Sequence, residues 1–204
     1  MENKNINYNS RMLINELLIE PEISKLMKKL KEKRYEVFLH SLNVAYLTCE
    51  VFFKCSKRLS SKYDEQYIKD TVTGALLHDI GKIKISNRVL LKKGKLNELE
   101  RNEINKHTLY GYEMVKDNPY FSDLTKEIIL SHHEKIDGSG YPNGKHKKEL
   151  KYGVRLVTVI DMFDALTEER AYREKNITCE ALKILYDAPV DIDAFIYLAS
   201  CSDL

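Results

Sequence analysis

Helical periodicity runs through most of the sequence and constrains the fold more than any other feature. In most segments, apolar side chains recur every three or four positions, as on the buried face of an amphipathic helix. Glycine and proline, which interrupt helices, number only 8 and 4 among 204 residues. Residues 154–160 have strand-like composition, but a single strand would have no partner. The sequence therefore predicts an all-α protein, a compact helical bundle with one main core.

Capping residues and short breaks separate the expected helices. Pro21 suits the first turn of a helix, Asp64 suits an N-cap, and either Ser122 or Asp123 suits another. Three glycines and a proline within residues 138–144 predict a tightly folded loop. Helices are expected at 21–33, 34–57, 64–80, 97–115, 123–134, 154–168, 178–185 and 192–198, with a loop of short turns at 82–94.

The overall charge and composition exclude several classes of partner. With 33 basic and 31 acidic residues the net charge is +2, which gives no electrostatic basis for binding a nucleic-acid polymer or a membrane. No apolar run is long enough to cross a bilayer, and the polar start of the chain lacks the features of a signal peptide. The four cysteines have no CxxC spacing, which indicates reduced thiols. We therefore expect a cytoplasmic protein.

Two pairs of adjacent residues carry the first signs of a metal site. His78-Asp79 ends an apolar run, and His132-His133 lies just before the glycine-rich loop. Imidazole is a good ligand for first-row transition metals. Alone, each pair also fits a simpler explanation, a helix-end histidine with a capping aspartate or a partly exposed surface pair. Neither pair decides the question by itself.

Two further pairs share helical faces. Asp161 and Asp164 are three residues apart in an apolar helix, where buried carboxylates need cationic or donor partners. A single capping or salt-bridged aspartate is the alternative interpretation. Glu36 and His40 are four residues apart, which is equally typical of an exposed ion pair. These positions gain weight only in combination with the other histidines.

The remaining histidines complete the set. His107 precedes Gly111 by one helical turn, and this glycine would let another helix approach that face; a histidine at the core edge is the alternative. His146 lies in a basic loop, and we expect no specific role for it. Together the sequence offers five imidazoles and several carboxylates but no set of thiolates. That combination indicates a two- or three-metal hydrolytic site for iron, manganese or zinc.

Three motifs in order resemble the HD-GYP family of HD-domain phosphohydrolases. Residues 78–82 read HDIGK, residues 132–142 contain HHE followed by DGSGYP, and residues 161–173 read DMFDALTEERAYR. The resemblance runs from Tyr35 to Arg173, with Ala171 in place of a usual proline. After Arg173 only the VDIDAF segment matches. We accordingly divide the chain into an N-terminal helical extension, 1–34, and an HD-GYP catalytic domain, 35–204.

The resemblance implies a metal-dependent phosphodiesterase. Members of this family hydrolyse the bacterial messenger cyclic di-GMP to pGpG, and some continue to GMP. Glu36 matches an extra carboxylate of members with three metals, and Lys82 matches a lysine that faces the phosphate. Asp79 is implied to be catalytic as well as a ligand. The implied metal ligands are Glu36, His40, His78, Asp79, His107, His132, His133 and Asp161.

The resemblance also implies substrate contacts and partners. The residues expected to contact the dinucleotide are Lys82, Gly138, Tyr141, Asp164, Arg170 and Arg173. A diguanylate cyclase and a second copy of the chain are the protein partners that it suggests. Two alternatives stay open: a phosphodiesterase for another cyclic dinucleotide, such as cyclic GMP-AMP, or a non-catalytic adaptor that binds a cyclic dinucleotide.

Overall fold

All regular elements in the described part of the chain are helices. The computed structural model describes residues 10–55, 59, 62–168 and 177–200, and the predicted all-α class is confirmed there. The helices are α1 (Ser10–Ile19), α2 (Pro21–Lys33), α3 (Tyr35–Lys54), α5 (Glu65–Leu77), α6 (Asn87–Leu90), α7 (Glu98–Asn105), α8 (His107–Val115), α9 (Asp123–Ser131), α10 (Tyr152–Glu168), α11 (Ile177–Asp187) and α12 (Ile192–Ala199), with 3-10 helices η1 (Ile80–Lys84) and η2 (Lys147–Glu149).

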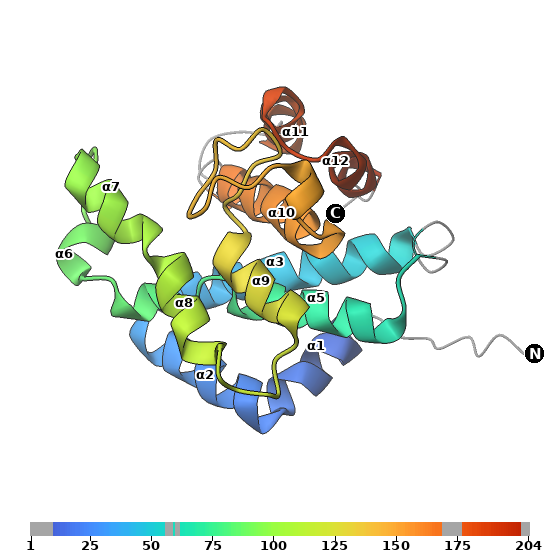
Figure 1. Cartoon of the computed structure of the whole chain (residues 1–204), viewed down its shortest axis with the longest axis horizontal. Coiled ribbons are helices and arrows are strands. Elements are labelled where there is room, and N and C mark those ends of the chain that lie inside the picture. The colour runs from blue at the N-terminus through green and yellow to red at the C-terminus, as the bar shows by residue number, and fades with distance from the viewer. Residues whose placement is uncertain (1–9, 56–58, 60–61, 169–176, 201–204) are drawn as a thin grey trace, which may run out of the picture.

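The central pair of helices is α3 and α5, and the other helices pack around it. Helices α1 and α2 pack against α3 on one side, while α10 packs against α3 on the other and is followed by α11 and α12 (Figure 1). Helix α9 packs against α5, and α8 packs against both α9 and η1. The core between them is filled by fully buried apolar side chains, among them Phe52, Leu76, Ile128, Leu156 and Ile160. None of the described helices is long and apolar enough to cross a membrane.

Helix α5 delivers the His78-Asp79 pair into the interior. The Asp64 side chain caps this helix as predicted, because it accepts a hydrogen bond from the backbone N–H of Tyr67. Every residue from Thr71 to Leu77 is buried. The helix ends at Leu77, so His78 is its C-cap and Asp79 lies beyond its last turn, although the sequence predicted a helix to residue 80.

The two N-terminal helices share the core with the rest of the chain. Leu13 and Leu17 of α1, and Ile23, Met27 and Leu30 of α2, are buried in the same cluster as the side chains of α3 and α5. The predicted domain boundary at residue 34 remains a prediction. The packing nevertheless shows that residues 10–33 contribute directly to the interior that surrounds the site.

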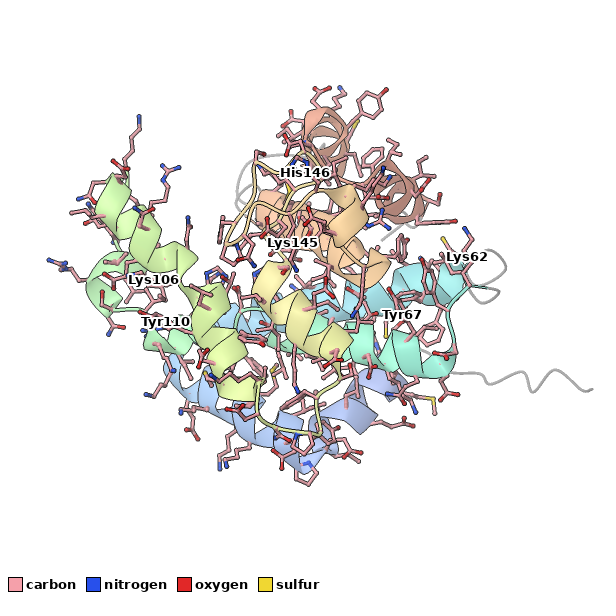
Figure 2. The ribbon with its side chains drawn as sticks, in the orientation of Figure 1. Lys62, Tyr67, Lys106, Tyr110, Lys145 and His146 are labelled. Atoms are coloured by element: carbon pink, nitrogen blue, oxygen red, sulfur yellow. The ribbon has the colours of Figure 1, made fainter. Side chains whose placement is uncertain are left out.

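The single helix predicted at residues 97–115 is wrong, because the structure has two helices there. Helix α7 begins with a capping box between Asn97 and Glu100, and it ends before Lys106. Lys106 keeps nearly helical angles (φ −67°, ψ −10°), so no side-chain pattern marks the break. Figure 2 shows Lys106 at the junction and Tyr110 one turn further along α8. The break allows α8 to lie against η1 while α7 extends away from the bundle (Figure 1).

Smaller differences concern other helix ends. The helix predicted to reach residue 134 ends at Ser131, with Ser122 as the cap that accepts from the Thr125 N–H. The predicted loop at 82–94 contains the end of η1 and the short helix α6. Helix α10 begins two residues earlier than expected, at Tyr152. The described cysteines are free thiols, as predicted, and Cys201 lies outside the described residues.

The close contact between η1 and α8 depends on two glycines. A Cβ at Gly81 would lie 1.9 Å from the carbonyl oxygen of His107 and 2.5 Å from the Gly111 nitrogen. A Cβ at Gly111 would lie 2.8 Å from the Ile129 side chain of α9. The predicted close approach of another helical element at Gly111 is therefore confirmed.

Replacing Gly81 by alanine should destabilise the protein. The new methyl group would meet backbone atoms that cannot move independently, so we expect the free energy of unfolding to fall by about 2 kcal/mol or more. Urea unfolding followed by circular dichroism measures this. Leu109→Ala, on the exposed side of α8, is the control and should change stability by less than about 0.5 kcal/mol. Equal stability of the two variants would contradict the contact.

Candidate metal centre

Seven of the eight predicted metal ligands meet in one place, although they come from five parts of the chain. Helix α3 supplies one, the segment after α5 two, the start of α8 one, the segment after α9 two, and α10 one. The structure arranges them as two groups, within each of which the potential ligand atoms lie no more than 4.8 Å apart. The first group is His40, His78 and Asp161, and the second is Asp79, His107, His132 and His133.

The first group surrounds one oxygen of Asp161. The Nε2 atom of His40 lies 2.9 Å from Asp161 Oδ1, and the Nε2 atom of His78 lies 3.6 Å from the same oxygen. His78 is fully buried, whereas the His40 side chain is 11% exposed. The group therefore has one open side, at His40.

The second group surrounds one oxygen of Asp79. The Nε2 atoms of His107 and His132 lie 3.3 Å and 3.9 Å from Asp79 Oδ1. His133 reaches across to the first group, since its Nδ1 lies 3.7 Å from Asp161 Oδ2. This group is almost wholly buried, with His133 as its most exposed side chain at 26%.

Asp79 and Asp161 connect the two groups. The second oxygen of Asp79, Oδ2, lies 3.4 Å from His78 Nε2 and 3.8 Å from His40 Nε2. Asp161 likewise turns Oδ1 to the first group and Oδ2 to His133. Each carboxylate thus has one oxygen for each group. If two cations were bound, Asp79 and Asp161 could therefore contribute ligand atoms to both groups.

Helix ends orient three of the imidazoles. His78, His107 and His132 each follow the end of a helix, where the last carbonyl oxygens lack helical partners. The Nδ1 atom of His78 lies 2.8 Å from the Ala75 oxygen, and that of His107 lies 2.7 Å from the Ile104 oxygen. The Nδ1 atom of His132 is 3.2 Å from two such oxygens. A proton on each Nδ1 directs Nε2 toward the centre, where it can bind a metal once it carries no proton of its own.

The resulting cluster of acceptors fits a divalent metal. The Nε2 atoms of His107 and His132 lie only 3.2 Å apart, so two lone pairs would face each other without a hydrogen between them. The buried atoms His78 Nε2 and Asp79 Oδ1 have no hydrogen-bond partner among the described residues. Buried polar atoms are normally satisfied, and a cation between these atoms would satisfy them all.

The electrostatics of the two groups differ. Burial alone would lower the pKa of His40, but the carboxylates of Asp161, Asp164 and Asp79 outweigh it and raise the pKa to about 10. Burial would likewise lower the pKa of His78, but Asp79 and Asp161 raise it to about 9. Burial lowers the pKa of His107 to about 3. In the metal-free protein the first group therefore holds protons at neutral pH, while His107 is neutral and ready to bind a cation.

The other members follow the same physical logic. Burial lowers the pKa of His132 far below its usual range, and it also lowers that of His133. Burial would raise the pKa values of Asp79 and Asp161, but neighbouring cations hold both well below their usual range. Lys82 is the chief cause for Asp79, and the hydrogen bond with His40 is the chief cause for Asp161. Both carboxylates are therefore ionised.

A cavity of about 210 Å³ opens beside the first group. It is lined by Glu36, Val37, His40, Asp79, Lys82 and Ala165. The Nζ atom of Lys82 lies 2.6 Å from Asp79 Oδ2, and its side chain is 21% exposed. Glu36, the eighth predicted ligand, is exposed at this cavity and belongs to neither group. The Arg34 guanidinium holds η1 in place by donating to the carbonyl oxygens of Lys82 and Ile85.

Asp164 contacts His40 from behind. Its Oδ2 lies 2.6 Å from His40 Nδ1, on the opposite side of the ring from Asp161. A carboxylate in this position fixes the ring orientation and increases the basicity of the other nitrogen. Its predicted contact with the dinucleotide remains a prediction. Arg170 and Arg173, the two other residues expected to contact the substrate from this segment, lie outside the described residues.

The glycine-rich loop, residues 135–150, lies beside the second group. Buried Glu134 accepts hydrogen bonds from the backbone N–H groups of Asn143 and Lys145, at 2.7 and 3.0 Å. Gly140 passes so close to residues 133–135 that a Cβ there would lie 2.4 Å from the Lys135 nitrogen. The backbone N–H of Tyr141 donates to the carbonyl oxygen of His133, and the centroids of the two side-chain rings lie 4.8 Å apart.

Two residues in and beside this loop were missed by the sequence reasoning. Glu134 was noted only as part of a motif, and its apolar surroundings at the end of α9 are the signal that could have indicated burial. His146, for which no specific role was expected, makes structural contacts that the sequence did not predict. Its ring packs against Gly138, whose φ of +81° and lack of a side chain make room for it. Its backbone also pairs with Asp137 in an antiparallel bridge.

Comparison with known proteins agrees with this geometry. The HD domain family matches residues 39–194. The response regulator RpfG of Xanthomonas campestris, a cyclic di-GMP phosphodiesterase, is 42% identical over 60% of this chain and 32% of its own length. A cyclic di-GMP phosphodiesterase of Thermotoga maritima is 31% identical over 87% of this chain and 49% of its own length. A 3'3'-cGAMP-specific phosphodiesterase of Vibrio cholerae is 38% identical over 64% of this chain and 29% of its own length.

Solved structures share the fold at lower sequence identity. An HDG"Y"P protein from Bdellovibrio bacteriovorus has a TM-score of 0.65 at 18% identity, covering 96% of this chain and 69% of that one. The HD domain of the L. monocytogenes phosphodiesterase PgpH in complex with cyclic di-AMP has a TM-score of 0.58 at 17% identity, over 86% and 93%. The chain spans less than half the length of the curated relatives named above. The chain belongs to the HD domain family, as its motifs of the HD-GYP kind predict.

Proposed function

We propose that this protein is a metal-dependent phosphodiesterase that hydrolyses cyclic di-GMP to pGpG, with GMP as a further product. The observation that carries the proposal is the pair of ligand groups that share Asp79 and Asp161 and leave buried acceptor atoms unsatisfied. The relatives named as cyclic di-GMP phosphodiesterases support the choice of substrate. We place its action in the cytoplasm, with a diguanylate cyclase or a second copy of the chain as proposed protein partners.

The proposed ligands divide into two sites. His40, His78 and Asp161 would hold one metal, and His107, His132 and His133 the other, with Asp79 between them. Bound there, divalent iron or manganese, or zinc, would supply Lewis-acid charge that activates water and neutralises a phosphodiester. Glu36, exposed at the cavity beside His40, is the residue that we propose for a third metal.

Protein side chains have their own roles in this proposal. Lys82 lines the cavity and is paired with Asp79. Its charge would stabilise the negative charge that a phosphate oxygen gains during attack. Asp164 keeps the His40 ring in one orientation and directs its Nε2 inward. The tight contact of Gly140 with residues 133–135 holds Tyr141 beside His133, at the border of the second group. The loop would thus form one wall for the dinucleotide.

A second substrate has specific support. A relative named as specific for 3'3'-cGAMP is 38% identical to this chain, close to the 42% of the cyclic di-GMP phosphodiesterase RpfG. The metal centre would be the same for both substrates, because both contain the same kind of phosphodiester bond. The choice between them depends on groups that contact the bases.

Metal-loaded protein should hydrolyse cyclic di-GMP. We expect multiple turnovers to pGpG after anaerobic loading with Fe(II) or Mn(II), and no turnover after chelation, because water activation depends on the metal. Chromatography of the products measures this. Parallel reactions with 3'3'-cGAMP, alone and in competition, determine the preferred substrate. Failure to cleave either dinucleotide, with a related enzyme active in the same buffer, would overturn the proposal.

Asp79→Asn should lower both metal content and activity. The variant keeps the size of the side chain but removes the charge that faces both groups, so bound metal should fall by at least one ion per chain. We expect turnover to fall by roughly 100-fold or more. Elemental analysis and turnover assays measure the two effects. Asp137→Asn, on the exposed loop, is the matched control and should retain full metal. Unchanged metal in Asp79→Asn would refute the assignment.

Metal binding should release protons. His40 and His78, with pKa values of about 10 and about 9, are protonated near pH 7.5 in the metal-free protein, and a metal must displace those protons. Apparent affinity should therefore rise with pH up to about 9 to 10. In the metal-free protein, the contribution of these two protonated histidines to the free energy of unfolding is complete below pH 6.5. It is lost as the pH rises through their folded-state pKa values of about 9 and about 10. Calorimetry in buffers of different ionisation enthalpy measures the release, and heats that do not depend on the buffer would contradict it.

A further inference from the structure

Asp191 is a buried carboxylate far along the chain from the metal ligands. It caps α12, since its Oδ1 accepts from the backbone N–H groups of Asp193 and Ala194 at 3.0 and 3.1 Å. Its Oδ2 contacts the Arg155 guanidinium of α10 and lies 3.0 Å from Lys147 Nζ. The Asp191 side chain is 0% exposed. One carboxylate thus joins α12, α10 and the end of the glycine-rich loop.

The base of the loop has a second attachment at the same place. The Ile136 N–H donates to the Pro189 carbonyl oxygen at 3.2 Å, just before α12 begins. Lys147 donates its own N–H to the Ile136 oxygen at 3.1 Å, next to the bridge between Asp137 and His146. The two ends of the loop are therefore joined to each other and then to the segment that contains Asp191.

The inner part of the loop is attached to the metal side. Glu134 binds the N–H groups of Asn143 and Lys145, and His133 accepts from Tyr141. Lys145 also contacts Glu127 of α9 through Nζ, at 3.8 Å. Figure 2 shows Lys145 and His146 on the loop beside α10. Glu134 and Asp191, two buried carboxylates, hold the loop from its two sides.

Because both Lys147 and Arg155 neutralise Asp191, the contact of the loop with Asp191 can be removed without disturbing the fold. Burial would raise the pKa of Asp191, but the hydrogen bond from Lys147, with the N–H of Ala194, lowers it. Loss of Lys147 alone would leave Arg155 to neutralise the carboxylate, so the helix cap and the contact with α10 would remain. Lys147 is 44% exposed, and its removal creates no buried cavity.

We propose that Asp191 and Lys147 are positioning residues, which attach the glycine-rich loop to α12 and thereby hold Tyr141 at the substrate side of the metal centre. The inference rests on the proposed function and extends it, because it gives the C-terminal helix control over substrate affinity. The two residues touch neither the metal ligands nor the reacting phosphate. Their loss should accordingly raise KM and change kcat little.

The test compares four variants of the metal-loaded full chain. Lys147→Met removes the ion pair, and Lys147→Arg restores a cation there. Lys148→Met removes the same charge one residue away, where the exposed lysine makes no ion pair with any described residue. Asp191→Asn keeps a capping side chain but removes the charge. The measurements are kcat and KM for cyclic di-GMP, metal content, and hydrogen exchange of residues 136–147.

The expected results differ among these variants. Lys147→Met should raise KM by roughly two- to five-fold, as suits a partly exposed ion pair, with kcat and metal content unchanged. Hydrogen exchange in the loop should speed up. Lys147→Arg should restore both values, and Lys148→Met should leave both within about 1.5-fold of the wild type. Asp191→Asn should show a larger KM effect than Lys147→Met.

Two results would overturn the inference. Equal KM increases in Lys147→Met and Lys148→Met would mean that the basic loop only attracts an anionic substrate. Unchanged loop exchange in both Lys147→Met and Asp191→Asn would mean that the ion pair does not hold the loop. If the wild type cleaves no cyclic dinucleotide, the proposed function fails, while hydrogen exchange still tests the attachment of the loop.

Discussion

The burial of the Asp79 carboxylate is the constraint on which the rest of the site depends. With its side chain 1% exposed, this carboxylate needs positive partners on both oxygens. Lys82 lies against Oδ2, whereas Oδ1 has only the neutral imidazoles of His107 and His132 around it and still needs a cation. Three helices must end or begin near this point to supply these groups. The packing of α5, α8 and α9 therefore both fills the core and brings together the groups that surround the Asp79 carboxylate.

Helix termini solve a second problem, the orientation of neutral imidazoles in a buried site. A histidine within a helix finds the nearby carbonyls already bonded, whereas one at a helix end finds them available. His78, His107 and His132 all use such carbonyls for Nδ1. The break at Lys106 therefore has a role in the site, because it places His107 just after the end of α7 instead of in the middle of one long helix. His107 gains the Ile104 oxygen as a result.

The sequence predicted the fold class and the convergence of the metal-ligand candidates, because ligand types and motif order are local properties of the chain. It could not predict features that depend on packing between distant segments. The break at Lys106 needs only a small change in the backbone angles, which stay nearly helical. No glycine or proline therefore marks it in the sequence. Glu134 and Asp191 resemble ordinary surface acids until the loop folds over one and α10 packs against the other. The sequence placed Asp164 on the same helical face as Asp161, but its contact with His40 could be seen only in the folded structure.

Five acids of the described chain are buried, namely Asp79, Glu134, Asp161, Asp164 and Asp191. The way in which their charges are satisfied separates the two acids of the metal centre, Asp79 and Asp161, from the other three. Glu134 is bonded by backbone N–H groups, Asp164 by His40, and Asp191 by Arg155, Lys147 and its own helix. Each of these three has a structural role that the protein itself completes. Of the five, only Asp79 keeps a buried oxygen without a hydrogen-bond partner in the described part, and that oxygen faces imidazole lone pairs. An acceptor surrounded by acceptors is stable only with a cation among them, so the unmet need for charge at Asp79 is what distinguishes a site for chemistry from a set of structural contacts.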